Sequence, residues 1–155
     1  MAITMKDVRA WLDAEEPDYA GAKQALGTAA VPFLLELVQG GDLALASKAT
    51  YLASMIQSTQ SPAVVHAAAQ SREAILRVAA ASCIRNLPLV QAEKVLDSLK
   101  GDPDAGVRKV AVKSATRFTS ARVAAKLELM AQSDPEPFVR EQAISTVKEI
   151  RAKVR

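Results

Sequence analysis

The chain of 155 residues carries a formal net charge of +3, is 50% hydrophobic and contains only 4% aromatic residues. Its apolar stretches are much shorter than the roughly 20 residues that a transmembrane helix needs, and charges interrupt the N-terminal segment, which argues against a secretory signal. Lys and Arg number 4 against 7 Asp and Glu in residues 1–69, but 9 against 5 in residues 70–120. We therefore expect a cytoplasmic protein with an acidic N-terminal part and a basic centre.

Apolar residues three and four positions apart predict helices along the whole chain. Residues 5–14 and 17–26 form a short pair, and we expect 1–28 to be an irregular hairpin that caps one end of a stack, with Trp11 closing that end. Four regular hairpins follow, at residues 30–58, 61–87, 89–118 and 120–152. The expected fold class is all-α, a right-handed α-solenoid of about five helical hairpins, with residues 1–155 in a single domain.

A repeat of about 32 residues supports this division. Residues 102–108 (DPDAGVR) match residues 134–140 (DPEPFVR), and each motif precedes apolar positions that share one helix face. Asp102 is expected to cap a helix that begins at Pro103. Shifting these apolar positions by one repeat at a time gives the residues that we expect in the core. They are Val107, Ala111, Ala115 and Phe118; Val139, Ala143, Val147 and Ile150; Ile75, Ala79 and Cys83; and Leu45, Ala49 and Ala53.

The pattern Asp-Pro-Asp-x-x-Val-Arg, followed by an alanine-rich amphipathic helix, resembles the HEAT-repeat family over nearly the whole chain. The resemblance implies a structural ladder of aspartates and arginines between neighbouring repeats, which falls here on Asp102, Arg108, Asp134 and Arg140. Gln70 and Leu76 stand at the equivalent positions one repeat earlier, so we expect the ladder to be incomplete there. HEAT-like stacks include scaffolds, transport receptors, regulatory subunits and occasionally enzymes, so the resemblance indicates the fold more than the function.

The sequence offers no constellation for catalysis. His66 is the only histidine, and the iron-dependent HEAT-repeat hydroxylases need several His-Glu pairs. Cys83 is expected in the core, where a thiol is inert. HEAT-like DNA glycosylases use tryptophans around a damaged nucleotide, whereas this chain has one tryptophan. A bilin-lyase-like role is a remote alternative, because those relatives share no motif. We expect no enzyme, no metal and no cofactor.

Basic residues gather on the second helices of two adjacent hairpins. At about 100° per residue, Lys109 and Lys113 point away from the core, and family geometry implies that this face lines the concave surface. Like charges four residues apart repel slightly, so their spacing does not stabilise the helix. The candidate partner-binding residues are Arg77, Arg85, Lys109, Lys113 and Arg117, with Tyr51 as an apolar contact.

We expect a protein-interaction or scaffold module that binds an acidic peptide or helix in a concave, locally basic groove. The alternative is a weakly sequence-specific nucleic-acid binder related to HEAT-like DNA repair proteins, with the same residues on phosphates. The modest net charge weighs against it, as do Glu141 and Glu149, which interrupt the stripe. An enzyme ranks third, because the chain has no nucleophile–base pair or ligand cluster. A solvated face without a partner explains the basic stripe about equally well. We expect a monomer or a weak dimer.

Overall fold

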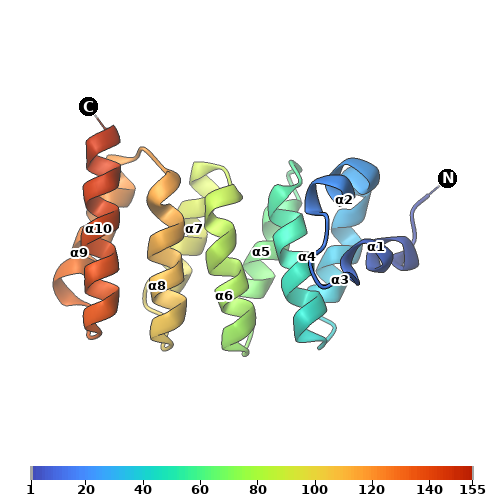
Figure 1. Ribbon diagram of the computed structural model, residues 1–155, viewed down its shortest axis with the longest axis horizontal. Coiled ribbons are helices and arrows are strands. Elements are labelled where there is room, and N and C mark those ends of the chain that lie inside the picture. The colour runs from blue at the N-terminus through green and yellow to red at the C-terminus, as the bar shows by residue number, and fades with distance from the viewer. Residues whose placement is uncertain (1, 155) are drawn as a thin grey trace.

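The computed structural model describes residues 2–154, and these form two layers of helices (Figure 1). The first helices of the regular hairpins make one layer: α3 (Val31–Val38), α5 (Ser61–Ala69), α7 (Leu89–Leu99) and α9 (Ala121–Ser133). The second helices lie side by side in the other: α4 (Leu43–Met55), α6 (Ala74–Cys83), α8 (Ala105–Ser114) and α10 (Pro137–Lys153). No β-strand occurs in residues 2–154. The expected all-α solenoid is therefore confirmed.

The N-terminal pair, α1 (Met5–Leu12) and α2 (Tyr19–Leu26), packs differently from the regular hairpins. Figure 1 shows α1 lying crosswise to the long helices at the N-terminal end of the stack. Thr4 starts α1 with a capping box, in which its hydroxyl accepts the Asp7 N–H and the Asp7 carboxylate accepts the Thr4 N–H. Trp11 is half-buried against the core and faces Gly21 of α2, where an added Cβ would lie 3.1 Å from the ring.

The core positions of the second helices repeat every 31 residues and take a step of 32 only at the last repeat. The equivalent buried residues are Leu45, Leu76, Val107 and Val139, followed by Ala49, Ala80, Ala111 and Ala143. The expected positions Ile75 and Ala79 are wrong by one residue, since Ile75 is 60% exposed and Ala79 is only half-buried. One residue turns a helix by about 100°, so this slip also changes which face carries Arg77.

The start of α8 differs from expectation as well. The helix begins at Ala105, and its N-cap is Asp104, whose carboxylate accepts the N–H groups of Gly106 and Val107. The expected cap Asp102 lies in the preceding loop and accepts the Asp104 N–H at 2.9 Å. Its carboxylate therefore has room for a partner from another repeat.

Most of the expected core residues of the last two repeats are buried, including Phe118 and Ile150. Val147 is the exception and is half-buried, because α10 packs against α8 and α9 on one side and has no further helix beside it within residues 2–154. Cys83 is fully buried, and burial raises its pKa to about 11. No helix of the described chain is long and apolar enough to cross a membrane.

Candidate functional site

Two arginine–aspartate pairs join the last three repeats. Arg77 donates from Nε and Nη2 to the carboxylate of Asp102 at 2.7 and 3.2 Å. Arg108 donates in the same way to Asp134 at 2.8 and 3.0 Å. The Nη1 groups of the two arginines bind backbone carbonyls of their own repeats, Ser71 at 3.0 Å and Asp102 at 2.8 Å. Each arginine thus connects its own repeat to the next.

These pairs are shielded from solvent and stay charged. The side chains of Arg108 and Asp134 are 9% and 4% exposed. Burial by itself raises the pKa of the Asp102 and Asp134 carboxyls, but the arginine and the backbone N–H that each one binds outweigh it and hold both pKa values below the usual range. Bidentate, charge-assisted hydrogen bonds of this kind fix the geometry of both partners.

Arg77 is therefore a member of the ladder. It does not belong to the exposed basic face on which it was expected. Ser71 and Arg77, rather than Gln70 and Leu76, occupy the ladder positions of their repeat. Arg140, the last expected member, donates from Nη1 to the Asp134 carbonyl at 2.6 Å and forms no ion pair within residues 2–154.

A second set of ion pairs, which the sequence reasoning missed, connects the first helices α7 and α9. Lys126 binds Glu93 at 3.0 Å and Asp97 at 2.9 Å, and Arg122 reaches Glu93 at 3.2 Å. The only sequence signal was the separation of Glu93 and Lys126, which is close to one repeat length.

Three basic side chains meet at the C-terminal ends of the second helices, in a surface hollow of about 380 Å³ that we call the basic groove. Arg85 and Arg117 lie on 3₁₀ turns that follow α6 and α8, and Lys23 comes from α2. Its other lining residues are Met55, Gln57 and Asn86. An overlapping hollow of about 360 Å³ shares Met55, Gln57, Asn86 and Arg117 with it and adds an apolar wall of Ile56, Pro62, Leu87 and Pro88.

Local contacts hold the two arginines of the basic groove without neutralising them. Arg117 donates from Nη1 to the Arg85 carbonyl, and its guanidinium lies 5.3 Å from the Phe118 ring centroid. Arg85 donates from Nε to the Ser82 carbonyl at 3.1 Å. No carboxylate lines the groove, and Lys23, Arg85 and Arg117 form no ion pair within residues 2–154. Unpaired cations beside amide donors suit a carboxylate or phosphate ligand.

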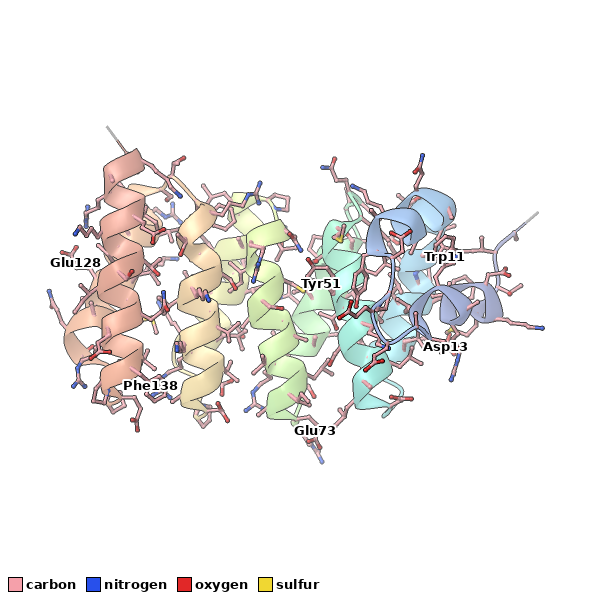
Figure 2. The ribbon with its side chains drawn as sticks, in the orientation of Figure 1. Trp11, Asp13, Tyr51, Glu73, Glu128 and Phe138 are labelled. Atoms are coloured by element: carbon pink, nitrogen blue, oxygen red, sulfur yellow. The ribbon has the colours of Figure 1, made fainter. Side chains whose placement is uncertain are left out.

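The other candidate residues lie elsewhere on the stack. Lys109 and Lys113 are exposed on α8, and the Lys109 ammonium lies 5.8 Å from the ring centroid of Phe138. Tyr51 is half-buried, and its ring packs edge-on against Tyr19 with centroids 4.7 Å apart. Figure 2 shows Tyr51 near the N-terminal hairpin and Phe138 at the far end of the stack. The structure thus groups Arg85 and Arg117 with Lys23, whereas Tyr51, Lys109 and Lys113 do not line the basic groove.

In residues 2–154, no three His, Cys, Asp or Glu residues gather closely enough to hold a metal ion.

The family model for HEAT repeats matches residues 61–148, which is more than half of the sequence. The chain belongs to the HEAT-repeat family. No curated protein matches this HEAT-repeat protein significantly in sequence.

Among solved structures, this HEAT-repeat protein is similar to a chain in the complex of CpcE and CpcF of phycocyanin lyase from Nostoc sp. PCC7120. The TM-score is 0.68 at 21% sequence identity, and the match covers 92% of this chain and 96% of that chain. At this identity the likeness shows a shared fold.

The same likeness corrects the expectation that this HEAT-repeat protein is not an enzyme. That expectation rested on the lack of a nucleophile–base pair and of a metal-ligand cluster. The similar chain belongs to a phycocyanin lyase, so a HEAT-like stack of this length takes part in an enzyme. Missing catalytic motifs therefore do not exclude an enzymatic role for this fold.

Proposed function

We propose that this HEAT-repeat protein is an interaction subunit that holds an acidic segment of a protein partner in the basic groove. The observation that carries the proposal is the convergence of Lys23, Arg85 and Arg117 without a carboxylate among the lining residues. Elsewhere in the second helices, Arg77 and Arg108 are already neutralised by aspartates of the next repeat. The basic groove is thus where unpaired positive charge gathers over three different hairpins.

The chemistry of the groove favours a peptide over nucleic acid. Met55 lies inside it, and Ile56, Pro62 and Leu87 line the adjoining hollow, so apolar side chains of a peptide have surfaces to contact. No aromatic ring lines either hollow, whereas proteins that bind single strands stack bases on aromatic side chains. The similar solved chain occurs in a complex of two proteins, which also favours a protein partner.

The test is a fluorescence-anisotropy titration with a labelled glutamate-rich peptide and, separately, with random single-stranded and duplex oligonucleotides. We expect peptide binding at physiological salt that falls at least tenfold, about 1.4 kcal/mol, in a Lys23→Glu, Arg85→Glu, Arg117→Glu variant. A Lys6→Glu, Lys94→Glu, Lys148→Glu variant, at three exposed positions outside both hollows, changes the net charge equally. It is the matched control and should keep most of the wild-type affinity.

Two results would contradict the proposal. Equal losses of affinity in the groove variant and in the control variant of equal charge would mean that only net charge matters. Tight oligonucleotide binding at physiological salt, with log affinity falling by about 0.9 per neutralised phosphate on duplex, would make nucleic acid the ligand. A Lys109→Glu, Lys113→Glu variant separates the two surfaces, since neither lysine lines the basic groove.

A second candidate function is a subunit of a lyase. The likeness to a chain of a phycocyanin lyase extends over almost the full length of both chains, which favours a role for the whole stack rather than for one repeat. Binding of the purified protein to immobilised phycocyanin would support this candidate. No binding, together with peptide binding in the basic groove, would favour the interaction subunit alone.

A further inference from the structure

The two repeats at residues 61–87 and 89–118 present the same stripe to the repeat that follows each of them. In α6 and the 3₁₀ turn after it, the stripe consists of Arg77, Ala81 and Ile84. In α8 and its 3₁₀ turn, the equivalent positions hold Arg108, Val112 and Ala115. The four apolar members are at most 1% exposed. The arginine of each stripe binds the aspartate of the next repeat. The contact surface between repeats is thus an apolar strip with an arginine at one end that receives a carboxylate.

Helix α10 carries this stripe without a neighbour in residues 2–154. Its positions hold Arg140, Ile144 and Val147, and Arg151 continues the same face one turn later. We call these four residues the α10 end face. Ile144 is 57% exposed, whereas the equivalent Val112 is fully buried. Figure 1 shows α10 as the last of the second helices, beside α8 and in front of its own partner α9, with no further hairpin beyond it in residues 2–154.

Arg140 is held in the conformation of a ladder arginine but lacks the carboxylate. Its Nη1 donates to the Asp134 carbonyl at 2.6 Å, just as Arg108 Nη1 donates to the Asp102 carbonyl at 2.8 Å. The Nε and Nη2 groups, which bind an aspartate in Arg77 and Arg108, have no hydrogen-bond partner in the described part of the chain. A half-buried guanidinium that is already fixed on one side loses little further freedom when a carboxylate binds.

We propose that the α10 end face docks a helical hairpin of a partner protein, which places an aspartate or glutamate on Arg140 as Asp134 does on Arg108. The α6–α8 and α8–α10 interfaces supply the template for this occupant, since each combines buried apolar residues with one bidentate arginine–carboxylate pair. This inference does not depend on the basic groove, whose lining residues are different ones.

The charges of the face argue against a second copy of this chain as the occupant. Arg140 and Arg151 stand at the two ends of the stripe, so two α10 helices packed antiparallel would place arginine opposite arginine. Arg151 is paired with Glu128 of its own chain at 2.6 Å, and both side chains remain about half exposed. A partner with acidic groups at the ends of an apolar strip complements this face.

The test supplies such a hairpin to the intact protein. A second copy of residues 121–154 is fused to the C-terminal end of the chain through a flexible Gly/Ser linker. The linker keeps this copy at a high effective concentration near the α10 end face. Amide hydrogen exchange in α10 is then compared with that of a fusion in which the appended copy carries Asp134→Asn. We expect about tenfold slower exchange with the aspartate, which corresponds to about 1.4 kcal/mol, because a hydrogen bond to a charged acceptor is stronger than one to a neutral amide.

Arg140→Gln in the original chain, and not in the appended copy, should abolish the difference in exchange rate between the two fusions. Arg151→Gln in the original chain should leave most of that difference. Equal exchange in the aspartate and asparagine fusions would overturn the proposal. Sedimentation of the unfused protein tests the other occupant: a concentration-dependent dimer that Ile144→Arg dissociates would make the face a homodimer interface and would also overturn it. A monomer at the same concentrations is the result that we expect.

Discussion

The Arg108–Asp134 pair allows a quantitative prediction for the ladder. Replacing Arg108 with alanine removes two charge-assisted hydrogen bonds from a carboxylate that is 4% exposed and leaves it only the Glu136 N–H at 3.0 Å. Removing one partner of a buried pair costs about 3–5 kcal/mol, mostly because the other charge stays buried and uncompensated. Because the Glu136 N–H still binds the carboxylate, we expect the loss of stability to lie near the lower end of this range, at about 3 kcal/mol.

Urea unfolding followed by circular dichroism gives the free energy of unfolding of wild type and variant. For a chain of this size about 3 kcal/mol corresponds to a melting temperature lower by roughly 6–12 °C. Arg151→Ala is the matched control, since its partner Glu128 is 48% exposed and exposed pairs contribute at most about 1 kcal/mol. If Arg108→Ala and Arg151→Ala cost the same, the reasoning from burial is refuted.

Three further predictions concern the core, the ladder carboxyls and the cysteine. Phe118→Ala should cost about 3–5 kcal/mol in urea unfolding through lost transfer energy and a cavity, while Lys113→Ala should stay within about 0.5 kcal/mol; similar values would mean that the helix faces are misassigned. The pKa values of Asp102 and Asp134 are lowered in the folded protein, so their contribution to stability is complete above the unfolded value of about 3.9 and is lost as the pH falls through the folded values. The free energy of unfolding of the wild type should therefore begin to fall below about pH 4, and that of Asp134→Asn should have a shallower pH dependence. Cys83, buried and with its pKa raised to about 11, should react with a thiol reagent only on unfolding; rapid labelling of the native protein would contradict its burial.

The fold could be predicted because its signals are local. The start signals and the spacing of apolar residues located the helices within a few residues, and the matched motifs around Arg108 and Arg140 identified the repeat. The register of α6 could not be predicted in this way, since Ala79, Ala80 and Ala81 follow one another and give no contrast between its faces. A step of 32 residues therefore looked as good as the observed 31, and Arg77 was assigned to the wrong face.

The candidate site was less predictable because it depends on long-range packing. Arg85 and Arg117 were found from helix periodicity, but Lys23 lies some sixty residues earlier, in the irregular N-terminal hairpin. No periodic pattern connects that hairpin to the regular repeats. The unpaired side of Arg140 was equally hidden, since the sequence motif is the same whether or not a carboxylate follows in the next repeat.

The ladder also bears on how the stack can bend. A bidentate fork resists rotation between the two repeats that it joins, because both N–H···O bonds must keep their direction. Such forks hold the α6–α8 and α8–α10 junctions, whereas at the α4–α6 junction alanine and serine, Ala46 and Ser71, stand at the ladder positions. A neutral hydrogen bond across that junction, from Asn86 Nδ2 to Ser54 Oγ at 3.0 Å, lies at the end that borders the basic groove. Changes in curvature should therefore concentrate between α4 and α6, where they would widen or narrow the distance between Lys23 and Arg117 while the C-terminal three repeats move as one body.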